Sequence, residues 1–230
     1  MYLIRCLLLG LCLGILGRPL WAQPAPTHAF EGLQEGDLLF QDLDCGSFCQ
    51  AIEAVTEGRH GKDFSHIGLV VRDDDQWKVL EAVSAGVRLV HLDRFLNRSL
   101  DDHQQPKVWV GRTDLSAKAR RQAVQWALQQ LGAPYDDAFV IDNDRYYCSE
   151  LIRDAFQTEA GHYLFEWTPM TFIDPETGRT FPVWKSYYQN LHRPIPEGAP
   201  GINPGLISRS PHVRIVHRYD ETAGAQVDQP

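Results

Sequence analysis

Apolar positions recur at helical spacing in the segment 146–156 and separate cleanly from the polar ones. The residues on the apolar face are Leu151, Ile152, Ala155 and Phe156. This pattern predicts an amphipathic helix with Cys148 at or near its first turn. Unpaired backbone N–H groups and the positive end of the helix dipole favour a thiolate there, and the thiolate is the nucleophilic form of cysteine. Cys148 is therefore a candidate nucleophile; the structural alternative is a small apolar residue buried at a helix start.

Upstream of this helix, short apolar runs bounded by turn residues predict strands. The runs are 36–41, 64–71, 77–83, 87–92 and 107–112. Because tight turns separate the middle three, we expect them to form an antiparallel meander. Helical spacing predicts helices over 46–56 and from Thr113 or Ser116 to residue 131, with a helical turn at 93–98. The pattern indicates an α+β fold, a small antiparallel sheet packed against helices.

The chain changes character after Gly161, where aromatic residues and prolines become frequent. We interpret 33–160 as the core domain and 161–220 as an extension packed on it, with a loose tail at 221–230. Within this extension we expect a short helix near 182–189, a Pro/Gly loop at 194–205, and a last strand. The residues expected in that strand are Ile207 and 213–216.

The N-terminus has the features of a secretory signal peptide. A basic residue, Arg5, precedes an almost wholly apolar run, and Ala22 offers a small residue at a cleavage point. The alternative is an uncleaved membrane anchor, but the run is short and Arg18 interrupts it. We therefore expect residues 1–22 to be removed and the protein to be exported, to a periplasmic or extracellular location, with no transmembrane segment afterwards.

Cysteine count and net charge narrow the chemistry further. After cleavage the chain keeps Cys45, Cys49 and Cys148. The close pair Cys45 and Cys49 could form a small-loop disulfide and leave Cys148 free. A metal site at this pair is disfavoured because no second pair stands at ligand spacing, and we expect no metal or cofactor. The net charge of −8 gives no indication of a nucleic-acid partner.

Two polar residues lie inside predicted apolar strands. His66 comes early in the run 64–71, and Glu81 lies in the middle of the run 77–83. A buried carboxylate must be paired or must shift its pKa. Counting out from the turn between the two strands puts Glu81 within a couple of residues of His66, so the side chains could meet across the sheet. For His66, the structural alternative is a hydrogen-bonded core histidine.

Five short motifs follow one another along the chain in an order that resembles a known family. The motifs are Gly36-Asp37-Leu38-Leu39-Phe40, Ser65-His66-Ile67-Gly68-Leu69-Val70, Leu80-Glu81-Ala82, Gly132-Ala133-Pro134-Tyr135-Asp136 and Tyr147-Cys148-Ser149-Glu150-Leu151-Ile152. Together they resemble the YiiX/YaeF-like group of circularly permuted NlpC/P60 (papain-like) cysteine hydrolases. The resemblance runs from about residue 35 to about 158, and the segment after 160 lies outside it.

The resemblance implies a role for each matching residue. The helix cysteine of the family falls on Cys148, its strand histidine on His66, and its polar third residue on Glu81. The implied oxyanion donors are the backbone N–H of Cys148 with Tyr147 or Ser65 nearby.

Tyr135 and Asp136 belong to the same implied site. They are expected to shape the cleft or to hold the loop before Cys148, with a structural turn and a buried ring as the alternative.

The implied activity is that of an exported cysteine hydrolase that cleaves an amide bond, in a cell-wall peptide or a related amide, through a thioester. Acyl-lipid hydrolysis or transfer is the second interpretation, with the aromatic-rich segment lining an acyl-chain groove. A catalytically silent binding module for the cell envelope is the alternative of another class. The expected partners are thus a peptide, amide or acyl-lipid substrate, with peptidoglycan as one source.

Overall fold

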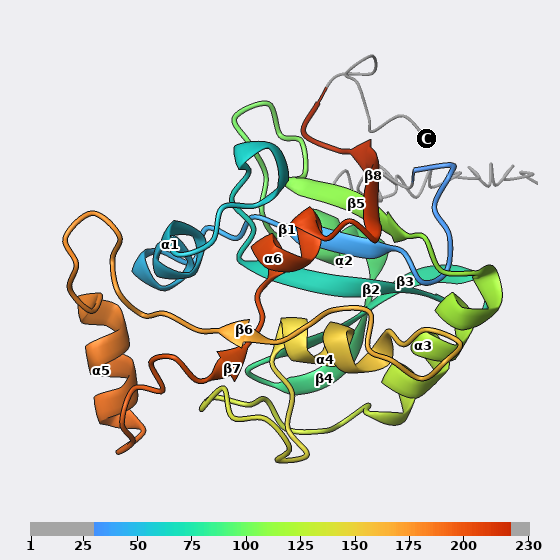
Figure 1. The fold of residues 1–230 in the computed structure, drawn as a ribbon. Helices are drawn as coiled ribbons and strands as arrows, with labels where there is room; N and C mark the ends of the chain where they lie inside the picture. The colour runs from blue at the N-terminus through green and yellow to red at the C-terminus, as the bar shows by residue number, and fades with distance from the viewer. Residues whose placement is uncertain (1–29, 222–230) are drawn as a thin grey trace, which may run out of the picture.

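Six antiparallel strands form the central sheet of the computed structural model, which describes residues 30–221 (Figure 1). Their order across the sheet is β4-β3-β2-β1-β5-β8. The bounds are β1 (Leu38–Gln41), β2 (His66–Asp73), β3 (Gln76–Val83), β4 (Gly86–His91), β5 (Val108–Thr113) and β8 (Val213–Arg218). The predicted signal peptide at 1–22 and all but the first residue of the predicted tail lie outside the described residues.

Strands β2, β3 and β4 form the predicted antiparallel meander, which is confirmed by their pairing. The β2–β3 hairpin turns at Asp74 and Asp75, whose φ angles of 45° and 58° suit the tight turns that match strand twist. The register places Leu69 opposite Leu80 and Glu81 opposite Arg88. A polar residue of β3 therefore lies beside a polar residue of β4.

Helices cover both faces of the sheet (Figure 1). One apolar cluster joins Ile67 and Leu69 of β2 to α3 (Ala117–Gln129) and α4 (Cys148–Ala155). A second cluster joins Val70 and Val79 to α2 (Leu92–Leu96) on the opposite face. With both faces covered, the central strand β1 is buried at every position, which explains its nearly continuous apolar sequence. The predicted α+β class is confirmed.

The helix starts follow local capping chemistry. Of the two cap candidates, Ser116 is the one used: its hydroxyl accepts the Ala119 N–H at 3.2 Å, whereas Thr113 ends β5. In α4 the Glu150 carboxylate reaches back to the Tyr147 N–H at 3.4 Å. Cys148 is therefore the first residue of its helix, as the sequence pattern indicated.

The segment after residue 160 returns to the central sheet. It contains β6 (Thr168–Pro169), α5 (Pro182–Asn190), β7 (Pro200–Gly201) and α6 (Pro204–Arg209) before β8. The expectation that Ile207 belongs to a strand is wrong, because Ile207 lies in α6. Asn203 caps this helix by accepting the Leu206 N–H at 2.9 Å, and Pro204 occupies its first turn, so local chemistry favours a helix there.

Two more short helices complete the fold, α1 (Ser47–Ala54) and the 3-10 helix η1 (Arg59–Gly61). Helix α1 packs beside α5, and Ala51 of α1 shares an apolar cluster with Phe172, Trp184 and Tyr188. The early helix is thus packed on the late, aromatic-rich segment. Across residues 30–221, no helix combines the length and apolar character needed to cross a bilayer.

Arg153 joins α4 to the segment after residue 160. Its guanidinium lies 3.4 Å from the centre of the Tyr163 ring and 4.4 Å from that of Trp167. It also donates to the Phe165 carbonyl at 3.3 Å and to Asp154 at 2.8 Å. Because this cation is buried, its stacking and hydrogen bonds cannot be replaced by water.

We expect Arg153→Met to lower the free energy of unfolding by about 1–3 kcal/mol, since the stem still packs but the charge-assisted contacts are lost. Chemical denaturation monitored by tryptophan fluorescence measures this. Arg121→Met, at an exposed position of α3, is the matched control and should change stability by less than about 0.5 kcal/mol. Equal stability of the two variants would contradict the fastening role.

Candidate active site

The start of α4 meets the start of β2, and this junction brings Cys148 next to His66. Helix α4 packs across β2 and β3. Both side chains are almost fully enclosed, with exposed fractions of 8% for Cys148 and 5% for His66. Glu81, from β3, is completely buried. The fold therefore gathers the three residues that the sequence singled out for catalysis into one buried group.

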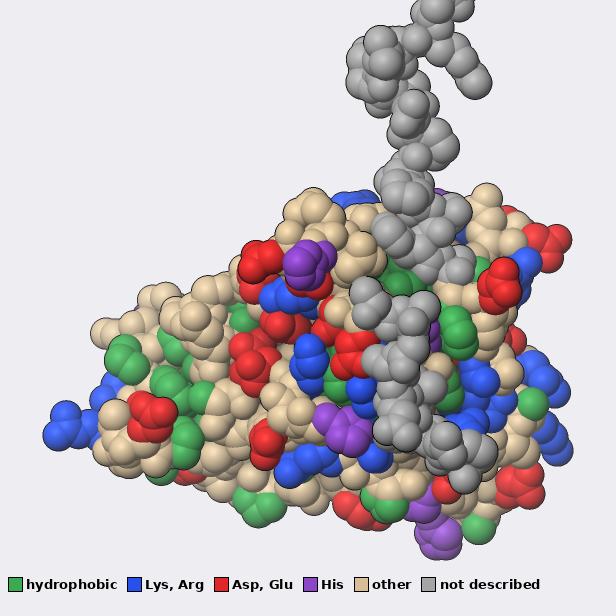
Figure 2. Space-filling model, turned by 90° about the horizontal axis from the view of Figure 1, so that it is seen from above, with side chains coloured by type: hydrophobic (Ala, Val, Ile, Leu, Met, Phe, Trp, Pro, Cys, Tyr) green, Lys and Arg blue, Asp and Glu red, His purple; other side chains and the backbone are tan. Residues whose placement is uncertain are grey.

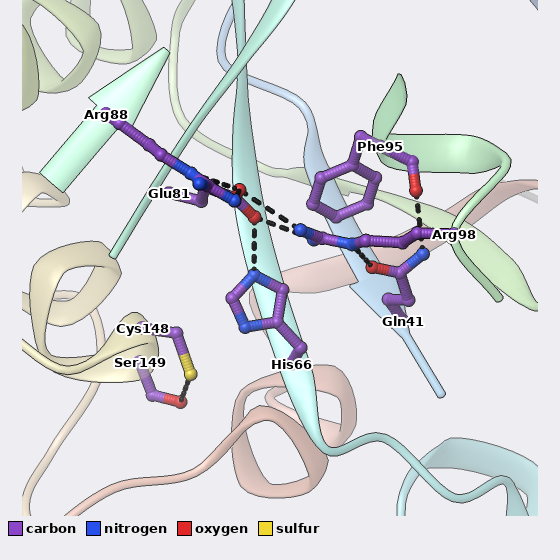
Figure 3. A network of polar contacts seen from close by, with 8 residues as sticks. All are labelled: Gln41, His66, Glu81, Arg88, Phe95, Arg98, Cys148 and Ser149. Carbon is purple, nitrogen blue, oxygen red and sulfur yellow. Dashed lines mark hydrogen bonds and ion pairs between the residues drawn. The ribbon is translucent and has the colours of Figure 1, made fainter. Parts of the chain in front are cut away.

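His66 and Glu81 form a direct polar contact. The imidazole Nε2 lies 2.8 Å from the Glu81 Oε2 (Figure 3). Strand register explains the contact, because the β2–β3 pairing of Leu69 with Leu80 places Glu81 near the beginning of β2. A carboxylate in this position can hold the imidazole in one orientation and stabilise its protonated form.

The other side of the His66 ring faces the Cys148 thiol (Figure 3). Burial by itself disfavours the thiolate, but hydrogen bonding to His66 and its charge outweigh burial, so the pKa of Cys148 is lowered. The Ser149 hydroxyl, 3.7 Å from the sulfur, and the Ile67 backbone act in the same direction. Burial likewise opposes charge on the ring, but Cys148 and Glu81 together raise the pKa of His66. The pair thus favours a thiolate beside an imidazolium.

Two arginines surround the Glu81 carboxylate on the side away from His66 (Figure 3). Arg98 donates to Oε2 at 2.6 Å and to Oε1 at 3.1 Å. Arg88 donates twice to Oε1, at 2.9 and 3.1 Å. Burial tends to raise the pKa of Glu81, but His66 and Arg98 prevail and hold it well below its usual range. Glu81 is therefore an anion at neutral pH.

Sequence reasoning missed both arginines. Arg88 could have been found, because it lies as far after the Ser84–Ala85 turn as Glu81 lies before it, and the two are paired across β3 and β4. Arg98 follows α2 and has no local pattern that points to Glu81. Only the packing of α2 on the sheet brings it there.

Of the predicted cleft residues, Ser65 and Tyr147 line the cavity beside Cys148 but use their hydroxyls structurally. The Ser65 hydroxyl accepts the Leu43 N–H at 3.0 Å. The Tyr147 hydroxyl accepts the Ile202 N–H at 3.1 Å. These contacts tie the late segment and the loop after β1 to the site.

Tyr135 and Asp136 are neighbours in sequence but face different surroundings. Tyr135 lines the cavity, and burial, followed by the nearby charge of Cys148, raises the pKa of its phenol well above the usual value. Asp136 is buried away from the cavity that holds Cys148 and accepts the N–H groups of Ala138 and Val140 at 3.0 and 2.6 Å. Asp136 therefore holds the loop, and Tyr135 shapes the cleft.

A disulfide joins Cys45 to Cys49 at the start of α1. Both cysteines line the cavity that contains Cys148. Within residues 30–221, Cys148 is the cysteine that remains a free thiol. In the same range, no group of three or more His, Cys, Asp or Glu side chains is arranged to hold a metal ion.

The cavity beside Cys148 has a volume of about 610 Å³ and predominantly apolar walls. Segments far apart in the chain build it, and representative wall residues are Phe48, Ile52, Phe139, Phe172, Trp184 and Ile202. Seen from above, apolar side chains gather toward the end of the molecule where α1 and α5 lie (Figure 2). His66 and Cys148 lie in a wall that is mostly apolar but also contains polar residues such as Ser65, Asn203 and Arg209.

Glu150 adds an unusual buried carboxyl in the first turn of α4. It is 2% exposed. Burial, followed by the charge of Asp136, raises its pKa to about 8. Glu150 is therefore largely protonated at neutral pH in the folded protein, two residues after Cys148 in the same helix.

Comparison with known proteins identifies the family of the chain. Residues 32–217 match the family model described as permuted papain-like amidase enzyme, YaeF/YiiX, C92 family. The chain belongs to this family, so the predicted kinship with YiiX and YaeF is confirmed. The match extends through most of the segment after residue 160, which the short motifs had left outside the resemblance.

Two individual relatives are similar to the chain. The uncharacterized protein YiiX of Escherichia coli K12 is 31% identical over 138 residues, which cover 59% of this chain and 63% of YiiX, slightly less than two thirds of its length. A crystal structure titled as metalloprotein yiiX from Escherichia coli O157:H7 has a TM-score of 0.66 and 26% identity. It covers 80% of this chain and 97% of that one. The description as a metalloprotein applies to the Escherichia coli protein.

We expect Cys148 to react with iodoacetamide well below the pH at which an ordinary thiol ionises, near 8.5, because His66 stabilises the thiolate. In the folded chain from residue 23, kept non-reducing so that Cys45 and Cys49 stay paired, mass spectrometry gives the rate against pH. His66→Ala should slow labelling at pH 6 by about tenfold or more.

His162→Ala, which removes an exposed histidine, is the control for that experiment and should label like the wild type. A wild-type rate that rises only near pH 8.5 would show that the thiol is not activated and would favour a silent binding module.

Glu150 predicts a specific pH dependence of stability. Its pKa moves from about 4.5 in the unfolded chain to about 8 in the fold, so the folded state binds the extra proton and stability falls as pH rises between these values. Glu150→Gln removes this titration and should stabilise the protein by about 2–4 kcal/mol at pH 8 and by little near pH 4. Denaturation at several pH values, with exposed Glu176→Gln as control, tests this; parallel curves for both variants would count against a buried neutral carboxyl.

Proposed function

We propose that the protein is a cysteine amidase in which Cys148 is the nucleophile, His66 the general base and acid, and Glu81 the residue that orients His66. The observation that carries this proposal is the line of contacts from a free, buried thiol through an imidazole to an ionised carboxylate, at the wall of a cavity. This is the order of roles that covalent acyl transfer requires.

The reaction follows from these positions. The Cys148 thiolate attacks the carbonyl carbon of an amide to give a tetrahedral oxyanion. The C–N bond then breaks, the amine leaves with the proton held by His66, and a thioester to Cys148 remains. His66, now neutral, takes a proton from water, whose oxygen attacks the thioester. Release of the acid restores the thiolate and the imidazolium.

Two groups support the oxyanion in this proposal. The backbone N–H of Cys148 belongs to the first turn of α4, where helical N–H groups have no partner within the helix. The Tyr135 phenol lies near the Cys148 thiol and keeps its proton at neutral pH. The Ser65 and Tyr147 hydroxyls accept backbone N–H groups of Leu43 and Ile202, and these contacts hold their oxygens in place at the cavity wall.

The apolar cavity favours an amide that carries a long apolar acyl group over a cell-wall peptide. Rings and aliphatic side chains make up most of its wall, and within residues 30–221 the charged side chains of the wall, apart from His66 and Cys148, are limited to Asp137 and Arg209. An acyl chain, in contrast, gains free energy from each buried methylene, about 0.8 kcal/mol. Hydrolysis or transfer of an acyl-lipid is the second candidate for the same reason, and the thioester is common to both.

The proposed location is outside the cytoplasm. The N-terminal sequence has the form of a signal peptide, and the Cys45–Cys49 disulfide suits an oxidising compartment. Together these features support an exported protein.

We expect the chain from residue 23 to hydrolyse N-acyl amino acids with kcat/KM that rises with acyl length, and Cys148→Ala to abolish turnover while the protein stays folded. Ile52→Trp, which narrows the cavity from α1, should lower kcat/KM for a long acyl chain about tenfold or more and leave a short one nearly unchanged. Chromatographic detection of the released acid measures both.

Gln50→Trp places the same ring on the exposed side of α1, outside the cavity wall, and should behave like the wild type. Turnover of a cell-wall peptide in preference to every acyl amide would overturn the acyl assignment but retain the cysteine amidase.

A further inference from the structure

We propose that Arg98 is a positioning residue of the active site: it fixes the Glu81 carboxylate toward His66 and, through its charge, limits how strongly His66 holds its proton. This inference rests on the proposed function and concerns a residue outside the Cys148–His66–Glu81 triad.

The Glu81 carboxylate has no freedom to rotate. Its Oε2 binds His66 at 2.8 Å and Arg98 at 2.6 Å, while its Oε1 binds Arg98 at 3.1 Å and Arg88 at 2.9 and 3.1 Å. Arg98 is the one that contacts both oxygens, including the oxygen that faces His66. Arg88 reaches only the far oxygen, and its side chain is more exposed, 36% against 24%.

Arg98 is itself held in place by a buried polar residue. Its Nε donates to the Gln41 side chain at 2.7 Å, and the Gln41 amide donates in turn to the Phe95 carbonyl at 2.9 Å (Figure 3). The guanidinium also stacks on the Phe95 ring, 4.3 Å from its centre. Gln41 is fully buried in the apolar strand β1, where a polar side chain costs stability unless it is hydrogen-bonded. These contacts leave Arg98 one orientation, with its planar fork on Glu81.

The charges around His66 determine whether removal of Arg98 makes His66 lose its proton more readily or less readily. The charged and titratable groups around His66 are Glu81 from β3, Cys148 from α4 with Tyr135 beside it, and the guanidinium groups of Arg88 and Arg98 behind Glu81. Glu81 and the Cys148 thiolate favour an imidazolium. The two guanidinium charges oppose it, because like charges in a partly desolvated site repel. Without Arg98, the imidazolium gains stability and releases its proton less readily.

The test is the pH profile of kcat/KM for the hydrolysis of an N-acyl amino acid, in which the alkaline limb reports loss of the His66 proton. Arg98→Gln should lower kcat/KM about tenfold or more and move this limb upward by about half to one pH unit. Arg98→Lys keeps the charge but not the fork, so it should lower kcat/KM severalfold and leave the limb in place. Arg94→Gln removes an exposed arginine of α2 and should match the wild type.

A cycle with Glu81→Gln separates positioning from a general structural role. If Arg98 acts through Glu81, Arg98→Lys should change kcat/KM little in the Glu81→Gln background. An equal loss in both backgrounds would overturn the proposal, and so would an Arg98→Gln profile identical to that of the wild type. If Arg98→Gln does not fold, the double-mutant cycle of Arg98→Lys with Glu81→Gln still tests the positioning role.

Different results would overturn the cysteine amidase and the positioning role of Arg98. Wild-type Cys148 without any activation by His66 would overturn the amidase and this proposal together. If Cys148 is activated by His66 but the pH profile and size of kcat/KM do not change when Arg98 is replaced, the positioning role alone is overturned.

Discussion

The completely buried carboxylate of Glu81 constrains the centre of this protein more than any other group. An ionised carboxylate removed from water is strongly destabilising unless charged and hydrogen-bonding partners replace the lost hydration. Here His66, Arg88 and Arg98 supply those partners. Their own positions depend on the neighbouring strands and on the segment after α2. The polar network is therefore inseparable from the strand order, because a shift of register in β2, β3 or β4 would leave a buried charge without its partners.

Of the residues His66, Glu81, Arg88, Arg98 and Gln41, His66 is the one that lines the cavity. On one side of the ring lie charged groups, and on the other lie Cys148 and the apolar cavity. The placement gives the imidazole two different environments, a charged one that fixes its orientation and a mostly apolar one. Helix α4 begins at Cys148, so its first N–H groups and its dipole lie beside the thiol that His66 also faces.

The segment after residue 160 supplies much of the cavity wall, and the family match also covers most of this segment. The cavity wall combines residues of α1, the loop before α4 and the stretch from 168 to 209. The Cys45–Cys49 disulfide closes the loop at the start of α1, and Arg153 joins α4 to the aromatic residues after 160. The late segment is thus part of the site as well as of the sheet, to which it contributes β8.

The sequence by itself determined the elements whose signals are local. Short apolar runs between turn residues located β2, β3 and β4, and a helical pattern located α4. Turn counting brought His66 near Glu81 because a short hairpin allows few registers. The order of motifs indicated the family. The same local chemistry was misread at Ile207, where an Asn–Pro helix start was taken for a strand.

Only the tertiary structure decided which distant groups complete the site. Arg98 reaches both Glu81 and Gln41 through the packing of α2 and β1, and no spacing in the chain encodes these contacts. The same holds for the part of the cavity wall formed by Phe172 and Trp184, which lie more than a hundred residues from α1 in sequence and pack on it in space. Long-range packing of this kind is set by the total burial of apolar surface and the pairing of buried charge, which are properties of the whole fold and not of any segment.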